Sequence, residues 1–374
     1  MTRKILGIDL RCLPADGSAG GGVAHAARAV TEEIVRLLGD RVIRYAVHGS
    51  ARVLARTIRE RPCDLLFVPS GAISPGLPVP AIPWVHDCDI FDHPEWFPQS
   101  WLKRQITTRL FLGGIKKAPV VFAASEYTRD AVMRLCGYAR ERIIVTGEGG
   151  DEALAVLGAG THASGVRLPE AKVRAMERVR SLGITKRFVL MLGTVEPRKN
   201  IPLICRIWPE VAKAVPDVDL VIAGQDGWKT AAIHVAIRNA GSQVHLIQKD
   251  RDQSRTEFTE QDRRDLLLAA DLVLVPSFSE GFGLVALEAI QAGTPVLASN
   301  RGALPEVVGK GEWLLDPEDE IAWRNMIIRV LSDDIFHQDM IARQSPRRDI
   351  FSWDKTAQKI ITTSPLINHQ TSAI

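Results

Sequence analysis

Two glutamates, Glu280 and Glu288, are the residues best placed for chemistry in this sequence. Glu280 lies in a loop rich in serine and glycine, and Glu288 lies two turns inside the helix predicted to follow it. Two carboxylates beside a phosphate would repel it, so they are unsuited to bind phosphate directly. They can accept hydrogen bonds from sugar hydroxyl groups, one on each side of a diphosphate. The alternative is that both lie on a solvated helix face.

The residues around this pair have the pattern of a strand, a loop, a helix and a second strand. Residues 271–275 are a short apolar run typical of a buried strand, and the helix is predicted to begin near Phe282 and to end at Gly293. Open α/β sheets bind ligands in loops at the C-terminal ends of their strands. Backbone N–H groups at the helix start can hold an anion, and Gly281 and Gly283 allow it to approach closely.

Two adjacent cations occupy a second position of the same kind. Arg198 and Lys199 lie between an apolar strand predicted at residues 187–192 and a predicted helix. Placed there, they would stand beside an anion site at the start of that helix. An ordinary location on the protein surface is the alternative for this pair.

The spacing of Glu280 and Glu288, together with Glu-Gly-Phe-Gly-Leu and Gly-Thr-Pro-Val, resembles the donor signature of retaining glycosyltransferase family 4. This resemblance implies the glycosyltransferase B fold, an α/β fold with two Rossmann-like domains facing each other across a cleft. It implies that Glu280 contacts the transferred sugar, that Glu288 contacts the ribose, and that Arg198 and Lys199 contact the diphosphate. The implied donor-binding residues are Gly21, Gly22, Arg198, Lys199, Glu280, Gly281, Phe282, Gly283, Leu284 and Glu288.

A histidine and an aspartate in the N-terminal half complete the implied site. His86 and Asp87 end a short predicted strand at residues 83–87, which resembles the Val-His-Asp motif of the family. The resemblance implies that His86, Lys199 and Glu280 are catalytic, with His86 facing the anomeric carbon of the donor. Asp87 is expected near the acceptor. A hydrogen-bonded histidine in the core is the alternative for His86.

Gly21 and Gly22 belong to a glycine loop between the first predicted strand, residues 4–10, and the first predicted helix, residues 23–38. The spacing is not the Gly-x-Gly-x-x-Gly of dinucleotide sites, which is a weak motif alone. In the resembled family this loop meets the donor phosphates or the acceptor. A flexible segment leading into the helix is the alternative.

The chain length of 374 residues suggests two domains. We expect an N-terminal acceptor domain at residues 1–168 and a C-terminal donor domain at residues 169–345. Residues 346–374 are expected to form a last helix that returns toward the N-terminal domain, followed by a tail. The resemblance covers nearly the whole chain and is most specific in the C-terminal half.

The composition is that of an ordinary globular protein, with a formal net charge of +3. This charge is too small for a nucleic-acid partner. Five scattered cysteines without a Cys-x-x-Cys pair suggest reduced thiols, and no signal peptide or apolar run of membrane-spanning length stands out. We expect a cytoplasmic protein. A basic helix with a tryptophan at residues 101–117 either contacts the anionic inner face of a membrane or is an ordinary helix with a solvated basic face.

The resemblance implies that a sugar moves from a nucleotide diphosphate donor to a hydroxyl group with its anomeric configuration retained. We expect no cofactor and no metal, because Asp87-Cys88-Asp89 has Asp-x-Asp spacing but belongs to the Val-His-Asp motif. The motifs look most like bacterial mannosyltransferases of surface-polysaccharide assembly, with GDP-mannose as donor and a lipid-linked saccharide as acceptor. A UDP-hexose or dTDP-rhamnose enzyme is the second hypothesis. A subunit that binds a sugar nucleotide without turnover is the third hypothesis. A nicotinamide-dependent dehydrogenase would need the Gly-x-Gly-x-x-Gly spacing of dinucleotide sites, which this chain lacks.

Overall fold

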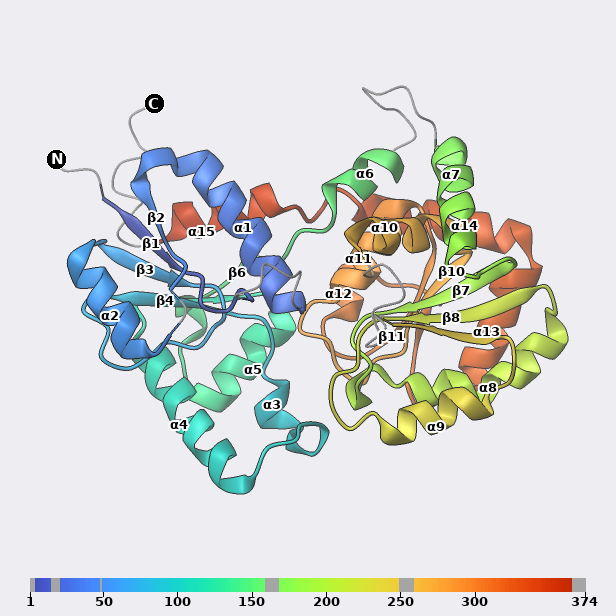
Figure 1. Cartoon of the computed structure of the whole chain (residues 1–374), viewed down its shortest axis with the longest axis horizontal. Helices are drawn as coiled ribbons and strands as arrows, with labels where there is room; N and C mark the ends of the chain where they lie inside the picture. Colours follow the sequence, from blue (N-terminus) through green and yellow to red (C-terminus); the bar gives the residue numbers. More distant parts are fainter. Residues whose placement is uncertain (1–3, 15–20, 48, 159–167, 249–258, 365–374) are drawn as a thin grey trace. The chain divides into compact units, whose positions relative to one another are not determined.

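The chain divides into two compact units, each built around its own sheet. The first unit comprises Met1–Pro94, Gln99–Gly149 and Phe351–Ile374, and the second comprises Glu95–Pro98 and Gly150–Ile350. The computed structural model describes residues 4–14, 21–47, 49–158, 168–248 and 259–364. Figure 1 shows the elements of both units.

The first unit contains six parallel strands in the order β2-β1-β3-β4-β5-β6. The strands are β1 Leu6–Asp9, β2 Val42–Tyr45, β3 Leu65–Val68, β4 Ala81–Val85, β5 Val121–Ala123 and β6 Ile143–Val145. The helices are α1 Gly22–Leu38, α2 Ala51–Glu60, α3 Asp89–Asp92, α4 Trp101–Lys117, α5 Glu126–Cys136 and α15 Trp353–Thr363. Most strand residues are buried, as expected for parallel strands covered by helices on both faces.

The second unit contains a second parallel sheet in the order β12-β11-β10-β7-β8-β9. Its strands are β7 Arg187–Leu192, β8 Val218–Ala223, β9 Val244–Ile247, β10 Leu272–Val275, β11 Val296–Ser299 and β12 Leu314–Leu315. Its helices are α6 Glu152–Gly158, α7 Leu168–Ser181, α8 Ile201–Ala214, α9 Ala231–Asn239, α10 Glu260–Ala269, α11 Leu284–Ala292, α12 Leu304–Val308, α13 Glu320–Ser332 and α14 Asp334–Gln344.

The strand order of the second sheet creates a switch point between β7 and β10. From β7 the chain proceeds to β8 and β9 on one side, and then returns to β10, β11 and β12 on the other side. The connections therefore leave the C-terminal ends of β7 and β10 in opposite directions. Ligands of doubly wound α/β sheets bind in the crevice that forms at such a point.

Helices cover both faces of the second sheet, with α10 and α11 on one face and α8 and α9 on the other (Figure 1). The interior is a continuous apolar cluster that takes in strand residues and the inward sides of these helices. Trp208 on α8 and Trp323 on α13 are fully buried in it. This packing gives the loops at the strand ends a rigid base.

Helix α15 belongs to the first unit, although the second unit precedes it in sequence. Its Asp354 carboxylate accepts from Arg36 of α1 at 2.5 Å, and the Trp353 ring lies 6.1 Å from the ring of His25. The backbone of Gly149 approaches Trp353 so closely that a Cβ atom there would lie 2.3 Å from the Trp353 nitrogen. Residues 351–363 are therefore an integral part of this unit.

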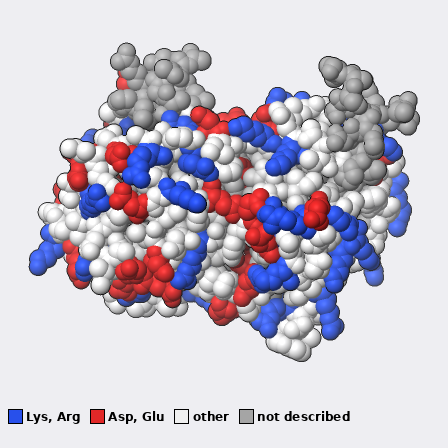
Figure 2. Space-filling model, turned by 180° about the vertical axis from the view of Figure 1, so that it is seen from behind, with Lys and Arg blue, Asp and Glu red and all other residues white. Residues whose placement is uncertain are grey.

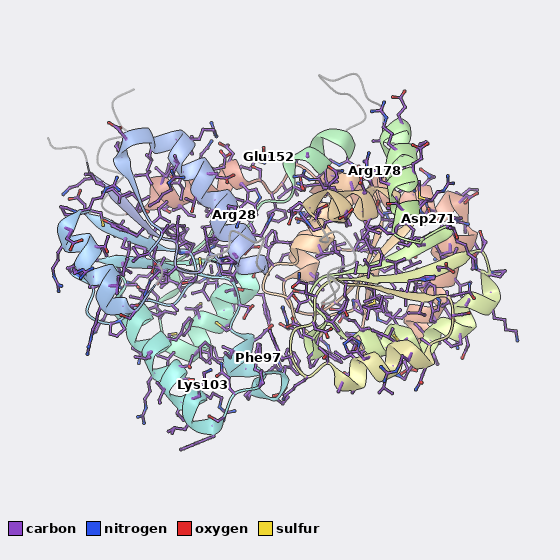
Figure 3. All side chains as sticks on the ribbon, viewed as in Figure 1. Arg28, Phe97, Lys103, Glu152, Arg178 and Asp271 are labelled. Atoms are coloured by element: carbon purple, nitrogen blue, oxygen red, sulfur yellow. The ribbon has the colours of Figure 1, made fainter. Side chains whose placement is uncertain are left out.

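Helix α4 places apolar and basic side chains together on its exposed side. Trp101 is 67% exposed, and Leu102, Ile106 and Leu110 are also exposed, whereas Ile115 is buried. Exposed basic residues, including Lys103 (labelled in Figure 3), lie among them. The helix bounds match the expected range of 101–117, but its apolar and basic residues are not divided between opposite faces.

Charges of both signs are interspersed over the face of the molecule shown in Figure 2. Together with the formal net charge of +3, this distribution gives that face no broad basic field of the kind that binds nucleic acid.

Candidate active site

The loops that follow β7 and β10 meet at the switch point of the second unit. The two strands pair directly, with Val189 opposite Leu272. Beyond the strands, the backbone N–H of Phe278 donates to the carbonyl oxygen of Arg198 at 2.9 Å. This bond brings the cations predicted after β7 beside the glutamate predicted after β10.

Glu280 is the centre of the resulting charge cluster. Its carboxylate accepts hydrogen bonds from Lys199 at 2.6 Å, from Arg198 at 3.0 Å and from the Ser277 hydroxyl at 2.7 Å. Burial alone would raise the pKa of Glu280, but the charges of Lys199 and Arg198 outweigh it and lower that pKa to about 2. Glu280 is therefore ionised at neutral pH.

Glu196 supplies a second carboxylate to the cluster, and the sequence had suggested no role for it. It is buried, and its Oε1 accepts from Arg198 at 2.9 Å and 3.1 Å. The two glutamates and the two cations together carry no net formal charge. An anion that binds here must compete with the carboxylates for Arg198 and Lys199.

Asn200 fixes the loop that carries both cations, and it too was missed in the sequence. Its side-chain amide donates to the carbonyl oxygen of Pro276 at 3.2 Å and to that of Pro317 at 2.8 Å. Its backbone is left-handed, with φ 53°, at the N-cap of α8. A non-glycine residue held in this conformation is uncommon and depends on its surroundings. Nothing in the local sequence marks Asn200 as the tie between these loops.

Helix α11 begins at Leu284, two residues later than expected, because Gly283 adopts a left-handed backbone with φ 103° at its N-cap. The predicted end is confirmed, since Gly293 caps the helix with φ 80°. Gly281 and Phe282 are buried just before this helix. The first backbone N–H groups of α11 thus lie at the same sheet edge as Glu280, where a helix start favours an anion.

The backbone of Gly302 and Ala303 packs closely against the backbone of Glu280. A Cβ atom on Gly302 would lie 2.7 Å from the backbone nitrogen of Glu280, so only glycine fits at this position. The next residue, Ala303, donates its N–H to the carbonyl oxygen of Glu280 at 2.9 Å. The backbone of Glu280 is therefore fixed independently of its side-chain ion pairs.

Glu288 lies one helix turn further into α11 and does not join the Glu280 cluster in the hydrogen bonds of the described residues. It is 1% exposed, and its carboxylate pairs with Arg263 of α10. The sequence predicted Glu288 as a binding residue but gave no indication of Arg263 as its partner.

His86 directly follows β4 in the first unit, and both of its ring nitrogens are engaged. Nε2 lies 2.7 Å from the carbonyl oxygen of Pro69, and Nδ1 lies 2.6 Å from the carboxylate of Glu148. A carbonyl oxygen only accepts, so Nε2 carries the proton of that bond. Burial would lower the pKa of His86, but the hydrogen bond and charge of Glu148 raise it above its ordinary value. This geometry favours an imidazolium held by Glu148.

Asp87, the predicted acceptor residue, follows directly and is only partly buried. Its Oδ1 accepts from the backbone N–H of Asp89 at 3.2 Å. This contact orders the turn into α3 and leaves the side chain at the C-terminal end of β4.

Gly21 and Gly22 begin helix α1, with Gly21 as an extended N-cap. A Cβ atom at either position would meet no heavy atom within 4 Å, so neither close packing nor left-handed backbone requires glycine here. The donor-binding role of both glycines stays a prediction.

Among the described residues, no group of three or more His, Cys, Asp and Glu side chains is arranged to hold a metal ion. In the same part of the chain, no helix combines the length and apolar character needed to span a bilayer.

Comparison with known proteins agrees with this architecture. Residues 176–345 match the family model described as glycosyl transferases group 1. The O-antigen chain mannosyltransferase B of Escherichia coli is 26% identical over 296 residues, which cover 77% of this chain and 70% of that protein. The serotype-specific mannosyltransferase WbdA of Escherichia coli is 27% identical over 259 residues, 67% of this chain but 29% of WbdA.

Among solved structures, that of Anabaena HepE in complex with UDP and glucose superimposes with a TM-score of 0.68. The two chains are 21% identical, and the match covers 96% of this chain and 98% of HepE. A likeness over nearly the full length confirms the expected pair of Rossmann-like domains.

Proposed function

We propose that this glycosyltransferase, whose residues 176–345 match the family model described as glycosyl transferases group 1, transfers mannose from GDP-mannose to a saccharide hydroxyl group. The anomeric configuration is retained, and the acceptor is a lipid-linked saccharide of polysaccharide or lipopolysaccharide assembly. Two relatives, the O-antigen chain mannosyltransferase B and the serotype-specific mannosyltransferase WbdA, support the sugar and the acceptor class. The observation that carries the proposal is the Arg198, Lys199 and Glu280 cluster at the switch point.

The cluster suits the departure of a diphosphate. When the bond between the anomeric carbon and the diphosphate breaks, negative charge grows on the phosphate oxygen. Lys199, Arg198 and the first N–H groups of α11 can stabilise that charge as fixed donors. Because the cluster is electrically balanced without a ligand, the incoming diphosphate displaces carboxylate contacts rather than entering an uncompensated basic pocket.

Glu280 acts in this proposal as a carboxylate and not as a general acid. A group with a pKa of about 2 holds no proton to donate at neutral pH. Its oxygens can accept hydrogen bonds from the hydroxyl groups of the transferred sugar and stabilise positive charge developing at its ring. The acceptor oxygen attacks from the face that the diphosphate leaves, and the acceptor proton passes to the departing phosphate oxygen.

For His86 in the first unit, the proposed role is that of a fixed cation. With Nε2 bonded to Pro69 and Nδ1 to Glu148, the ring has no lone pair available to act as a base. An imidazolium at the end of β4 would instead attract an anionic donor. Asp87 beside it is proposed to contact the acceptor hydroxyl.

A second candidate donor is a UDP-hexose, or dTDP-rhamnose. The solved structure of HepE is a complex with UDP and glucose, and this observation supports a UDP-hexose as the alternative donor. A subunit that binds the sugar nucleotide without turnover is the remaining hypothesis, and the ionised Glu280 cluster argues against it because each of its members has a use in transfer.

A donor panel tests the proposal. Hydrolysis and transfer should be measured with GDP-mannose, UDP-glucose and dTDP-rhamnose, and the anomer of the product determined by NMR. We expect GDP-mannose to be used in preference, with retention, and activity to persist in EDTA because the leaving group is handled by side-chain cations. Preference for another donor, inversion, or a complete loss in EDTA that Mn²⁺ or Mg²⁺ restores would each overturn that part of the proposal.

We also propose that α4 contacts the anionic inner face of a membrane, where a lipid-linked acceptor would lie. Four exposed apolar side chains on this helix, those of Trp101, Leu102, Ile106 and Leu110, lie among exposed lysines and Arg109. Such a surface combines cations for lipid phosphates with apolar groups that can enter the boundary between headgroups and acyl chains.

A further inference from the structure

Glu288 is almost completely removed from solvent, although it carries a carboxylate. It is 1% exposed, and its Oε2 accepts from Nη1 of Arg263. Arg263 lies 25 positions earlier in the chain, on the neighbouring helix α10. A carboxylate buried to this degree stays ionised only when a counter-charge accompanies it. Arg263 is the cation that meets this requirement in the structure.

Two further carboxylates hold Arg263 in place. Its Nε donates to Glu260 at 2.9 Å, and its Nη2 lies 3.5 Å from Oδ2 of Asp151. Because three acidic groups surround the guanidinium, its direction is fixed from more than one side. Burial would lower the pKa of Arg263, but the charge of Glu288 and then that of Glu260 raise it, so the cation persists.

Asp151 is itself a rigid anchor. Its Oδ1 accepts from the backbone N–H of Ala153, which caps the start of α6, and its Oδ2 accepts from Arg264 at 2.6 Å. Glu152, the first residue of α6, is labelled in Figure 3, and Figure 1 shows α6 beside α10 and α11. The chain of contacts therefore runs from a capped helix start, through Arg263, to the carboxylate of Glu288.

We propose that Arg263 is a positioning residue that keeps the carboxylate of Glu288 aimed at the ribose hydroxyl groups of the donor nucleotide. This inference rests on the proposed function and on the ribose contact that the sequence resemblance implies for Glu288, and it adds the residue that makes this contact selective. The planar guanidinium suits the task because it fixes the orientation of the carboxylate that it binds. Without Arg263, the carboxylate of Glu288 would lose its fixed direction, and this change weakens its bond to a hydroxyl group.

The test compares nucleotides with and without ribose hydroxyl groups. GDP and 2′,3′-dideoxy-GDP are titrated calorimetrically into the full-length chain, with UDP and 2′,3′-dideoxy-UDP in parallel. Hydrogen bonds to a charged group give the wild type a preference for the ribonucleotide of about ten- to a hundredfold. In Arg263→Gln we expect this preference to fall to near one, as in Glu288→Gln, and Arg263→Lys should restore part of it.

Arg264→Gln is the matched control, because Arg264 is adjacent to Arg263 and binds Asp151, whereas the ion pair with Glu288 is made by Arg263. It should keep the wild-type preference. If Arg263→Gln weakens both nucleotides of a pair equally, or keeps the preference, the positioning role is wrong while the proposed function stands. If the wild type itself does not distinguish the two nucleotides of either pair, Glu288 does not contact the ribose, and the donor placement fails together with this inference.

Discussion

At the scale of single residues, Glu280 is the group on which the account depends most. Its pKa of about 2 in the folded chain lies below the ordinary value of 4.5, so its ion pairs stabilise the fold above pH 4.5. This stabilisation is lost as the pH falls toward about 2. Glu280 therefore links the charge balance of this cluster to the acid stability of the second unit.

We predict that Glu280→Gln flattens the pH dependence of thermal unfolding. The wild-type Tm should fall more steeply than that of the variant between about pH 6 and about pH 3, because only the wild type loses a carboxylate with a lowered pKa. Glu210→Gln, which removes an exposed carboxylate of α8, should leave the slope unchanged. A gap between the wild type and Glu280→Gln that stays constant over this range would contradict the assignment.

The sequence was sufficient to select the charged residues but not their partners. Lys199, Arg198 and Glu280 follow neighbouring strands, and the structure brings them together. The partner of His86 is Glu148, 62 positions away, and that of Glu288 is Arg263 on another helix. Such pairs depend on how helices and loops pack, and no local pattern in the sequence records that packing.

At the scale of elements, the loops after β7 and β10 behave as one structure held by Asn200. The amide of Asn200 satisfies two carbonyl oxygens, and its left-handed backbone turns the chain from the 3₁₀ turn Pro197–Lys199 into α8. Two substitutions separate these contributions. Asn200→Gly loses the side-chain hydrogen bonds but tolerates the left-handed backbone. Asn200→Ala loses the same hydrogen bonds and is also strained by that backbone.

We expect both Asn200 variants to be less stable than the wild type, with Asn200→Ala lower by about 1 kcal/mol, the cost of a left-handed backbone for alanine. Urea unfolding measures this difference. Both variants should also lose turnover, since Lys199 lies on the loop that Asn200 holds. Equal stability of the two variants would show that the backbone conformation is not imposed on Asn200.

Helices α4 and α11 show how far the bounds of a helix can be predicted from the sequence. The range of α4 matches its expected bounds because Ser100 caps its start, with its hydroxyl accepting from the N–H of Lys103 at 3.4 Å. Helix α11 starts two residues late because Gly283 is left-handed. A glycine in the sequence permits a left-handed backbone but does not require it. The start of α11 is therefore known only from the folded chain.

The exposed side of α4 gives the membrane proposal a specific test. Binding to phosphatidylglycerol vesicles should exceed binding to phosphatidylcholine vesicles and should weaken with salt, because exposed charges are screened within about 10 Å at 0.1 M. Reversing Lys103, Lys116 and Lys117 to glutamate should weaken binding by about a hundredfold, since each basic residue near an anionic surface contributes about 1 kcal/mol.

The control for this test is a reversal of three exposed arginines, Arg52, Arg56 and Arg59, on α2 of the same unit. It changes the net charge equally but leaves α4 intact. Equal weakening by both triple variants would show that overall charge, and not α4, governs the attraction to vesicles.

At the scale of the whole molecule, the resemblance of the sequence motifs to a known family predicted the fold class, and the two parallel sheets confirm it. The order of strands within each sheet could not be obtained in this way. The neighbours β7 and β10 are separated by two intervening strands in sequence, and it is their pairing that creates the switch point. The account therefore depends on a tertiary arrangement that joins residues from distant parts of the second unit.

The central claim is that this switch point receives the diphosphate of a sugar nucleotide, and turnover of GDP-mannose by Lys199→Ala tests it most directly. Loss of a preorganised charge beside a leaving group lowers kcat by about a hundredfold or more. We predict such a fall with an unchanged circular dichroism spectrum. Lys213→Ala, which removes an exposed lysine from the α8 helix that follows Lys199, should keep the wild-type rate. A wild-type rate in Lys199→Ala would contradict the account.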